Sequence, residues 1–388
     1  MQYPLTPRRR ILLIAGTRPE AVKLAPVYRE LRARADFDAR LCVTGQHRSM
    51  LAQALEAFSI VPDYDLDVMR DGQDLFSLSS RCLDALGDLL RGDCGVGAWR
   101  PHCVVVQGDT TTTLTGAMSA LYAGIPLAHV EAGLRSGDLA RPFPEEANRR
   151  MVSRIASLHF APTERAALAL RNEGAPAASV YTTGNTVVDA LLDARRRAPV
   201  WPQTNGRKLV LVTGHRRESL GEGFQRICKA LDRIARRGDV EIVYPVHLNP
   251  QVHQPVHAIL GGHQNIRLIE PLGYLPFVGL MEASSIILTD SGGVQEEAPT
   301  LCKPVLIMRD VTERPEAVEA GAARIVGSDP ESIVAAANEL LDDPSVYAKM
   351  SAAKNPFGDG RAAGRIADIL AGFLEHGRDG NTPQDTEK

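Results

Sequence analysis

The stretch Val104-Val105-Val106-Gln107-Gly108-Asp109-Thr110 shows the pattern on which the fold of this chain depends, an apolar run that ends in a short polar segment. The same pattern recurs, with other polar residues, at positions 11–20, 126–133, 209–216 and 286–293. A continuous apolar run of this length is typical of a parallel strand that is buried on both faces. Open α/β sheets bind ligands just beyond the carboxyl ends of such strands. The sequence therefore predicts parallel sheets with functional groups directly after the strands.

Strand-length apolar runs alternate with helix-length segments in two series along the chain. The first series lies near residues 11–15, 40–44, 103–107, 126–131, 158–161 and 180–183. The second series lies near residues 208–213, 240–246, 266–269, 285–289, 304–308 and 324–326. Strands that alternate with helices form βαβ units and parallel sheets. Because 388 residues suffice for two domains, we predict an α/β protein with two Rossmann-like, doubly wound domains.

A polar, proline-bearing segment from Arg195 to Gly206 separates the two series and is typical of a linker or connecting loop. We expect the domain boundary near 183 or somewhat later. The N-terminal domain is thus predicted to cover residues 1–183 and the C-terminal domain residues 184–360.

One further helix is predicted at about 361–375, because its apolar residues recur at helical spacing and form one stripe. The stripe consists of Ile366, Ile369, Leu370 and Phe373. Such a stripe needs a surface to cover. Residues 376–388 are polar and contain glycine, and we expect them to form a disordered tail.

The composition, with 44% hydrophobic and 23% charged residues, is that of an ordinary globular protein. The net charge of −3 offers no general basic field, so we expect neither a nucleic acid nor an anionic membrane as a partner. The longest apolar runs have strand length, far short of the ~20 residues that a membrane-spanning helix needs. We interpret Arg8-Arg9-Arg10 and the run after it as a first strand rather than a signal peptide.

The six cysteines are scattered and form no Cys-x-x-Cys pair. This pattern favours reduced thiols in a cytoplasmic protein over a zinc site or a disulfide framework. His253, His257 and His263 have no metal-ligand spacing with carboxylates, so we predict no metal. We interpret His247, which follows a strand, as structural.

Carboxylates follow several of the predicted strands. Asp109 stands before four threonines, where an aspartate is also a common helix cap. Glu131 ends an apolar strand, and glutamate is seldom a cap there. The rigid turn Pro142-Phe143-Pro144-Glu145-Glu146 carries two more, one of which could be a capping charge of a helix at 146–156. Three carboxylates in one cleft would repel each other and raise the pKa of at least one, which makes a usable acid or base.

The second series carries groups suited to a phosphate. In Asp290-Ser291-Gly292-Gly293 the glycines would let the backbone approach a ligand, and the N–H groups of the next helix favour phosphate. A tight turn capped by serine is the alternative. In Gly214-His215-Arg216 the cations could hold a diphosphate, with a solvated charge cluster as the alternative.

The segment Arg-Pro-Glu-Ala-Val occurs twice, at 18–22 and at 314–318, and follows a predicted strand each time. Thr17 and Glu20 have the spacing of a capping box, with Pro19 at the helix start. The repeat therefore predicts an arginine at a helix N-terminus in each domain.

Taken together, the motifs identify a family. They are Gly-Thr-Arg-Pro-Glu-Ala at 16–21, Thr-Gly-Gln-His-Arg at 44–48, Gly-Asp-Thr-Thr-Thr-Thr at 108–113, His-Val-Glu-Ala-Gly-Leu-Arg at 129–135, Pro-Glu-Glu-Ala-Asn-Arg at 144–149, Thr-Gly-Asn-Thr-Val at 183–187, Gly-His-Arg-Arg-Glu-Ser at 214–219, Asp-Ser-Gly-Gly-Val-Gln-Glu-Glu-Ala-Pro at 290–299 and Arg-Asp-Val-Thr-Glu-Arg-Pro-Glu at 309–316. In this order, from about Arg10 to about Phe373, the chain closely resembles the bacterial non-hydrolysing UDP-N-acetylglucosamine 2-epimerases.

The resemblance implies a glycosyltransferase-B-like fold with the active site in the interdomain cleft and the last helix packing back on the N-terminal domain. It implies the reversible epimerisation of UDP-GlcNAc to UDP-ManNAc at C2, by anti elimination of UDP through 2-acetamidoglucal and re-addition. It further implies a cytoplasmic homodimer that uses no cofactor and supplies ManNAc units for cell-surface polysaccharide.

The resemblance also implies roles for individual residues. Catalytic roles fall on Asp109, Glu131, Glu145 and His215. Substrate binding falls on Arg18, Lys23, His215, Phe277, Ser291, Gly292, Gly293, Glu297 and Arg314. Possible regulatory roles fall on Gln46 and Arg216.

The chain departs from parts of the family at three positions. Members that need UDP-GlcNAc as an activator carry a glutamine and an arginine where this chain has Ser49 and Gly72, so we expect weak or altered activation. Leu272 replaces a glutamine that some members carry beside the uracil, so a contact at that position would come from the backbone.

Three other functions are alternatives to this epimerisation. A hydrolysing epimerase would release free ManNAc, but hydrolysing relatives usually carry a fused kinase domain. A glycosyltransferase would not need the three carboxylates for proton transfer, and neither would a catalytically silent nucleotide-sugar sensor.

Overall fold

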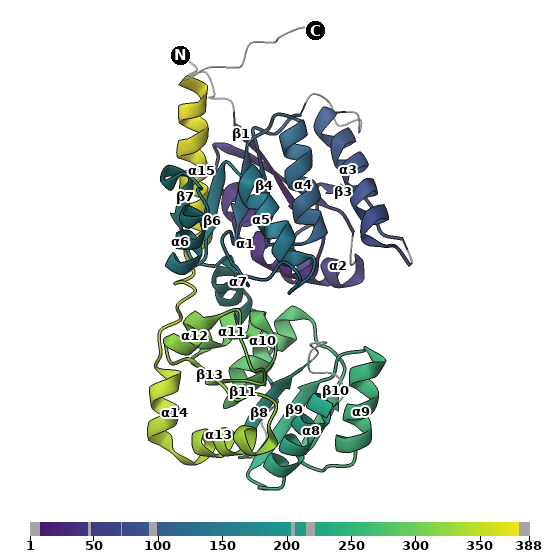
Figure 1. Ribbon diagram of the computed structural model, residues 1–388, viewed down its shortest axis with the longest axis vertical. Coiled ribbons are helices and arrows are strands. Elements are labelled where there is room, and N and C mark those ends of the chain that lie inside the picture. Colours follow the sequence, from purple (N-terminus) through teal and green to yellow (C-terminus); the bar gives the residue numbers. More distant parts are fainter. Residues whose placement is uncertain are drawn as a thin grey trace. The chain divides into compact units, whose positions relative to one another are not determined.

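The structure, a computed structural model, describes residues 8–45, 48–70, 72–92, 99–202, 206–214 and 222–379. The chain forms two compact units (Figure 1). The first consists of residues 1–190 together with 358–388, and the second of residues 191–357. Helix α7 (Thr186–Arg195) begins in the first unit and ends in the second. The first unit is therefore discontinuous in sequence.

The first unit contains a seven-stranded sheet in the order β3-β2-β1-β4-β5-β6-β7, and all its strands pair in parallel. The strands are β1 (Arg9–Ala15), β2 (Phe37–Val43), β3 (Tyr64–Asp65), β4 (Cys103–Gln107), β5 (Leu127–Val130), β6 (Leu158–Ala161) and β7 (Val180–Thr182). The strand order reverses between β1 and β4, and ligands of doubly wound sheets bind at such a switch point. A ligand site is therefore expected at the turns after β1 and β4.

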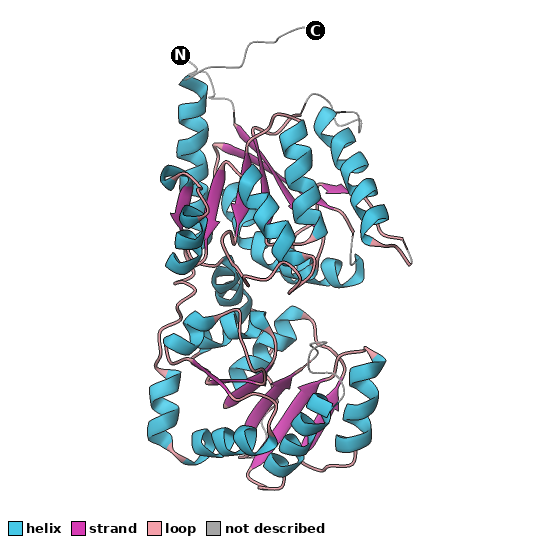
Figure 2. Cartoon of the chain, viewed as in Figure 1, coloured by secondary structure: helices cyan, strands magenta, loops and turns pink. Residues whose placement is uncertain are grey.

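Helices cover this sheet (Figure 2). They are α1 (Arg18–Ala33), α2 (Arg48–Ala57), α3 (Leu75–Arg91), α4 (Thr111–Tyr122), α5 (Glu145–Ile155), α6 (Glu164–Asn172), the short 3₁₀ helix η1 (Ala177–Ser179) and α15 (Ala362–Asp379). Between the sheet and α3, α4 and α5 lies an apolar core to which β1 and β4 contribute fully buried side chains. The continuous apolar runs of the sequence thus became central strands, as predicted.

The C-terminal helix α15 packs against α1, and the Arg34 guanidinium pairs with Asp368 at 2.7 Å. In its predicted stripe, Ile366 and Leu370 are fully buried and Ile369 and Phe373 are half-buried. The helix continues to Asp379, so residues 376–379, which we expected to be disordered, are helical. Glycines in the last turns each cost only about 1 kcal/mol relative to alanine, which is too little to end an otherwise favourable helix.

The second unit contains a six-stranded parallel sheet in the order β10-β9-β8-β11-β12-β13. The strands are β8 (Lys208–Thr213), β9 (Val240–Pro245), β10 (Ile266–Ile269), β11 (Ile286–Thr289), β12 (Val305–Ile307) and β13 (Ala323–Ile325). The helices are α8 (Glu222–Ala235), α9 (Pro250–Leu260), α10 (Tyr274–Ala283), α11 (Gly292–Glu297), the 3₁₀ helix η3 (Ala298–Leu301), α12 (Pro315–Glu319), α13 (Pro330–Asp342) and α14 (Pro344–Ser351). This sheet reverses its order between β8 and β11, directly before the predicted phosphate segments.

Every strand predicted from the sequence is present, and β3, which has two residues, was not predicted. Helix α5 begins at Glu145, one residue before the predicted start. None of the described helices combines the length and apolar character that crossing a membrane requires. Within the same ranges, no group of three or more His, Cys, Asp or Glu side chains is arranged to hold a metal ion.

Candidate active site

The turn after β1 has the predicted capping box. The Glu20 carboxylate accepts hydrogen bonds from the backbone N–H groups of Gly16, at 2.9 Å, and Thr17, at 2.6 Å. Arg18 is the first residue of α1, as the repeated motif predicted, and Arg314 is the N-cap of α12. The Arg18 side chain is half-buried and has no hydrogen-bond or ion-pair partner among the described residues. It is a cation available to an anionic ligand.

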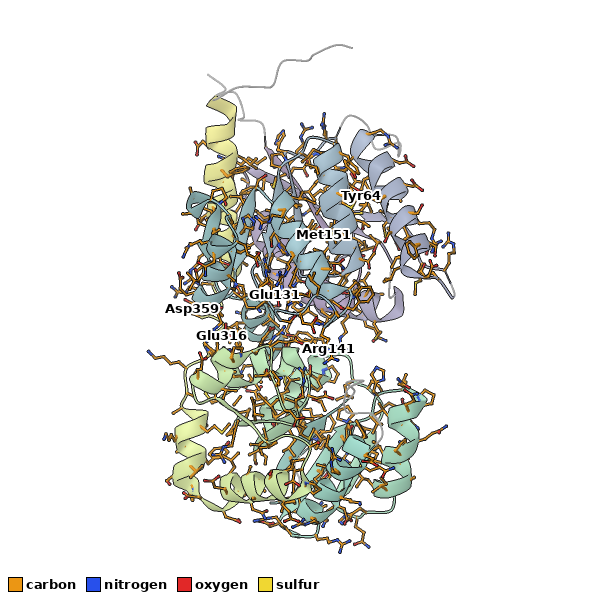
Figure 3. The ribbon with its side chains drawn as sticks, viewed as in Figure 1. Tyr64, Glu131, Arg141, Met151, Glu316 and Asp359 are labelled. Atoms are coloured by element: carbon orange, nitrogen blue, oxygen red, sulfur yellow. The ribbon has the colours of Figure 1, made fainter. Side chains whose placement is uncertain are left out.

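Glu131 follows β5 directly and is held in an unusual environment (Figure 3). Its backbone φ of +62° lies in the left-handed region, which costs a residue other than glycine about 1–3 kcal/mol. Both of its carboxylate oxygens accept from Lys23 Nζ, at 2.8 and 2.6 Å, and the Gln107 amide donates to one of them. Lys23, which we expect to bind substrate, is ion-paired with this carboxylate. The protein fixes Glu131 from both backbone and side chain.

Asp109 follows β4 and is paired with a cation as well. The Arg149 guanidinium donates to its carboxylate at 2.5 Å, and the Asn148 amide donates to its backbone carbonyl at 2.9 Å. The alternative of a helix cap does not hold, because the N-cap of α4 is Thr110, whose hydroxyl accepts from the Thr113 N–H. The Asp109 carboxylate is therefore not needed to cap α4.

The backbone just before Asp109 is fixed by a buried histidine. His129 Nε2 lies 2.7 Å from the Gly108 carbonyl oxygen, so this nitrogen carries the proton and donates it. Burial lowers the pKa of His129 to about 3, and the bond to the Gly108 carbonyl only partly opposes that shift. His129 is therefore neutral at physiological pH and orients the turn without adding charge.

The two glutamates at the start of α5 have different environments. Glu146 is fully buried and accepts from the Ser136 N–H and from Arg150 Nε, at 2.9 and 2.8 Å. Burial raises the pKa of Glu146, but these hydrogen bonds and the charge of Arg149 outweigh burial and lower it overall. Glu145 has one buried carboxylate oxygen that meets no donor in the described part of the chain. Glu146 therefore has a structural role, whereas Glu145 has a carboxylate oxygen that can accept a hydrogen bond from a ligand.

Cations offset the repulsion that we expected among the three carboxylates. Asp109 has Arg149 and Glu131 has Lys23, whereas Glu145 pairs with no cation in the described ranges. β4 and β5 run in parallel with Gln107 opposite Val130, so Asp109 and Glu131 follow neighbouring strands at the same edge of the sheet. The edge therefore carries two carboxylates with fixed geometry, which suits proton transfer.

In the second unit, Ser291 is the N-cap of α11, and its N–H donates to the Thr289 hydroxyl at 2.9 Å. The Arg314 guanidinium lies over Gly292, because a Cβ atom at that glycine would be only 3.2 Å from Arg314 Cζ. Arg314 Nε donates to the buried carboxylate of Glu296 at 2.8 Å. The arginine is thus held against the glycine turn that was predicted to bind phosphate.

Other predicted binding residues of the second unit lie nearby in the fold. The buried Glu297 carboxylate accepts from the Tyr274 hydroxyl at 2.6 Å. Phe277 is half-buried one turn further along the same helix, α10. Gly293 lies in the first turn of α11. Three predicted residues, Gln46, His215 and Arg216, lie outside the described residues.

Sequence reasoning missed the groups that position these side chains. Arg149 and Gln107 hold the carboxylates of the first unit, and Asn148 holds the backbone carbonyl of Asp109. In the second unit, Glu296 and Tyr274 hold the predicted binding residues. A signal existed for Arg149, which stands four residues after Glu145 and so on the same face of α5. The others come together only through the tertiary fold.

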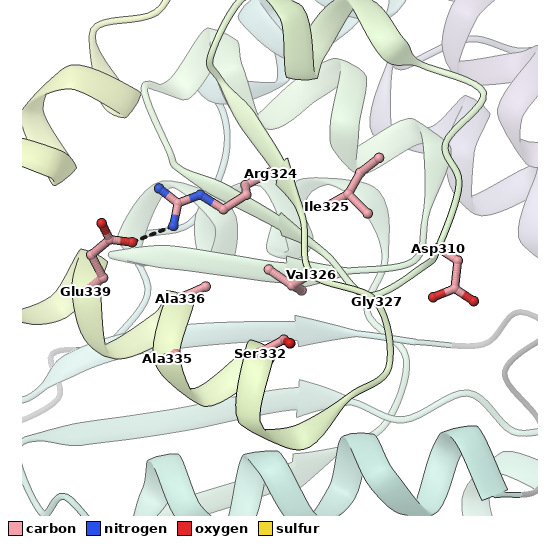
Figure 4. A pocket seen from close by; sticks show the side chains of 9 residues that line it. All are labelled: Asp310, Arg324, Ile325, Val326, Gly327, Ser332, Ala335, Ala336 and Glu339. Carbon is pink, nitrogen blue, oxygen red and sulfur yellow. Dashed lines mark hydrogen bonds and ion pairs between the residues drawn. The ribbon is translucent and has the colours of Figure 1, made fainter.

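A shallow pocket in the second unit, of about 640 Å³, lies between β13 and α13 (Figure 4). It is lined by Asp310, Arg324, Ile325, Val326, Gly327, Ser332, Ala335, Ala336 and Glu339. Arg324 is paired with Glu339. None of the predicted site residues lines this pocket, so it is separate from the candidate active site.

The chain matches the family model described as UDP-N-acetylglucosamine 2-epimerase over residues 29–371. It is 53% identical over 379 residues to a probable UDP-N-acetylglucosamine 2-epimerase of Ralstonia nicotianae, across 94% of this chain and 100% of that protein. The structure resembles that of the Neisseria meningitidis UDP-GlcNAc 2-epimerase bound to UDP-GlcNAc, with a TM-score of 0.87, 43% identity and coverage of 94% and 100% of the two chains. It also resembles the S. aureus MnaA–UDP co-structure, with a TM-score of 0.86, 43% identity and coverage of 95% and 97%. These similarities confirm the predicted fold class and the resemblance noted in the sequence, and the chain belongs to the UDP-N-acetylglucosamine 2-epimerase family.

Proposed function

We propose that this protein interconverts UDP-GlcNAc and UDP-ManNAc without hydrolysis, by eliminating UDP and adding it back. The observation that carries the proposal is the pair Asp109 and Glu131, two cation-held carboxylates at the ends of neighbouring strands. The Neisseria relative, whose solved structure contains UDP-GlcNAc, supports the substrate. The absence of an adjacent carbonyl makes the C2–H bond of the sugar only weakly acidic, so simple deprotonation and reprotonation at C2 is implausible.

Elimination avoids a free carbanion at C2. A carboxylate base takes the C2 proton while the C1–O bond breaks on the opposite face, and the electron pair of that bond leaves with UDP. A C1=C2 double bond forms, giving 2-acetamidoglucal. In the second half, a UDP oxygen attacks C1 and an acid delivers a proton to the other face of C2. Atoms and electrons balance without a cofactor.

The residues divide this work by their chemistry. Asp109, Glu131 and Glu145 share the proton transfers, because carboxylates placed within reach are the usual acids and bases for such steps. Arg18, Arg314, His215 and the turn Ser291-Gly292-Gly293 bind the diphosphate and stabilise the charge that develops on it. Glu297 and Phe277 hold the rest of UDP. Lys23 orients the Glu131 carboxylate through their ion pair and contributes to substrate binding near the phosphates.

The proposal extends to regulation and cellular role. Gln46 and Arg216 form a regulatory contact for a second UDP-GlcNAc, weakened by Ser49 and Gly72. The enzyme works as a cytoplasmic homodimer and supplies ManNAc units for cell-surface polysaccharide.

One incubation with UDP-GlcNAc alone, followed by NMR in D2O, tests the reaction. The expected products are UDP-ManNAc and residual UDP-GlcNAc, both with deuterium at C2. Free ManNAc with UDP would indicate hydrolysis instead. No change in the sugar would indicate a transferase or a sensor, and UDP-ManNAc without deuterium at C2 would contradict the elimination.

A further inference from the structure

Glu20 accepts more hydrogen bonds than a helix cap requires. Its carboxylate is 1% exposed and forms no ion pair within the described ranges of the chain. One oxygen accepts from the N–H groups of Gly16 and Thr17, which a capping box explains. The other oxygen accepts from the Thr110 hydroxyl at 2.7 Å. The Thr113 hydroxyl lies 3.0 Å from the same oxygen and also 2.7 Å from the Gln107 carbonyl, so its one hydrogen is shared between them.

These bonds connect two turns that are far apart in sequence. Gly16 and Thr17 form the turn after β1, which carries Arg18, and Thr110 begins the turn into α4, directly after Asp109. The two strands are neighbours at the point where the sheet order reverses. Glu20 therefore joins the two loops that meet at the switch point, which is where doubly wound folds bind their ligands.

The packing around Gly16 shows that these two turns fit tightly. A Cβ atom at Gly16 would lie 2.1 Å from Thr112 Oγ1 and 2.6 Å from Thr44 Oγ1, so only glycine is possible there. The two threonine hydroxyls are themselves hydrogen-bonded at 3.0 Å. The turn after β1 thus packs directly against the first turn of α4.

A cap alone would not need a buried carboxylate. Burial raises the pKa of Glu20, and the hydrogen bonds from Thr110, Thr17, Gly16 and Thr113 only partly offset that effect. Many caps of this protein are exposed, such as Asp74 at the start of α3. The burial of Glu20 between two loops is a cost that capping does not explain.

We propose that Glu20 is a positioning residue, which fixes the turn bearing Arg18 relative to the turn bearing Asp109. This inference rests on the proposed function, in which Arg18 stabilises the departing diphosphate and Asp109 takes part in proton transfer. A carboxylate displaced by about 1 Å can lower the rate about a hundredfold, so a fixed separation matters for turnover more than for binding. Glu20 itself touches neither substrate nor reacting atoms.

The test uses two substitutions that weaken the link from opposite sides. Glu20→Gln removes the charge but keeps the shape, and Thr110→Val removes the hydroxyl on the α4 side. Thr110→Ser keeps that hydroxyl and is the conservative rescue. Thr163→Val is the matched control for the lost cap, because Thr163 caps α6 through the Ala166 N–H in the same way. Asp189→Asn is the control for a half-buried carboxylate, since Asp189 accepts from the N–H groups of Ala362 and Ala363.

We expect kcat to fall at least tenfold in Glu20→Gln and in Thr110→Val, with UDP affinity by calorimetry within about twofold of the parent protein. Thr110→Ser should retain most of the turnover, and Thr163→Val and Asp189→Asn should retain nearly all of it below their melting temperatures. If the control substitutions lower kcat as much as Glu20→Gln does, Glu20 is only a structural residue and the inference is wrong. Should Glu20→Gln fail to fold, Thr110→Val and its rescue decide the question.

A double-variant cycle shows whether Glu20 acts through Asp109. Groups that act as a unit are strongly non-additive, so adding Glu20→Gln to Asp109→Asn should slow turnover little further. If Glu20→Gln lowers turnover in the Asp109→Asn background by the same factor as in the parent protein, Glu20 does not act through Asp109. Amide hydrogen exchange adds a readout that needs no activity, because Thr110→Val should speed exchange at Gly16 and Thr17, which it does not touch directly. Unchanged exchange there would overturn the inference, whereas absent UDP-ManNAc formation by the parent protein would overturn the proposed function alone.

Discussion

Lys23 Nζ lies 2.8 and 2.6 Å from the two carboxylate oxygens of Glu131, and both side chains are at most 10% exposed. The two residues come from α1 and from the turn after β5. Each is poorly suited to its place alone, since the lysine is buried and the glutamate has a left-handed backbone. Their ion pair explains how Glu131 can keep its strained backbone conformation at the edge of the sheet.

Replacing Lys23 by methionine should lower the free energy of unfolding by about 3–5 kcal/mol, because it leaves a buried carboxylate without its cation. The double variant Lys23→Met/Glu131→Gln should regain much of this stability but not the turnover. Urea denaturation at neutral pH measures both. Arg233→Met is the control, since both members of its pair with Glu331 are exposed and the pair should be worth under about 1 kcal/mol. Equal losses in the two single variants would show that the buried pair contributes little.

Neutralising any one proposed acid or base should stop most catalysis. Asp109→Asn, Glu131→Gln and Glu145→Gln should each lower turnover on the order of a hundredfold or more, with UDP affinity nearly unchanged. Glu146→Gln is the informative neighbour, because that buried side chain is bonded to Ser136 and Arg150 and should mainly affect stability. A Glu145→Gln variant with normal turnover would exclude Glu145 from the proton transfers.

Arg314→Ala should weaken UDP binding at least tenfold, because the guanidinium held over Gly292 can contact a diphosphate with two parallel hydrogen bonds. Arg314→Lys should recover only part of the affinity, since an ammonium lacks that fork. Arg324→Ala removes the same charge from the same unit, where Arg324 pairs with Glu339, and should leave the affinity unchanged. Isothermal titration with UDP compares the three. If Arg314→Ala and Arg324→Ala weaken UDP binding equally, the effect is due to net charge and not to a contact from Arg314.

His129 should make the protein less stable in acid. Burial lowers the pKa of His129 to about 3 in the folded state, against about 6.5 unfolded, so unfolding takes up a proton between these pH values. The stability due to the neutral ring is complete above pH 6.5. It falls by about 1.4 kcal/mol per pH unit as the pH drops towards 3. His129→Gln should therefore show a flatter decline of unfolding free energy between pH 6.5 and 4.5 than the parent protein. Parallel profiles would contradict the prediction.

The reverse reaction should start without a long lag. The resemblance implies that activated members hold a second UDP-GlcNAc with a glutamine and an arginine at the positions of Ser49 and Gly72, so this chain would lack strong contacts to a diphosphate there. Pure UDP-ManNAc should therefore be converted at once and linearly in a continuous assay. A long lag that trace UDP-GlcNAc abolishes would demonstrate strong activation. Restoring the arginine at position 72 should then increase the response to added UDP-GlcNAc.

Much of the fold was predictable because buried parallel strands leave continuous apolar runs in the sequence. Val104–Val106 and Ile11–Ile14 were recognised in this way, and the polar residues after them were placed at the correct edge of the sheet. β3 was missed because two residues carry no periodicity. The helix end at Asp379 was missed because composition says little about where a supported helix stops.

The sequence predicts which residues follow the strands at the candidate site but not how these residues pair with one another. Asp109 and Glu131 could be named from their positions after strands. Their partners Arg149 and Lys23 come from helices 40 and 108 residues away in sequence, and only the fold brings them together. Lys23 illustrates the limit, because its motif suggests substrate binding but does not reveal its ion pair with Glu131.

The discontinuity of the first unit has a consequence for the order of events on the ribosome. Residues 1–190 emerge first, yet the surface of α1 that α15 covers stays open until the last helix has been made. During the synthesis of some 170 intervening residues, 191–357, the nascent first unit carries an uncovered apolar face. The first unit is thus the first to be synthesised and the last to complete its fold.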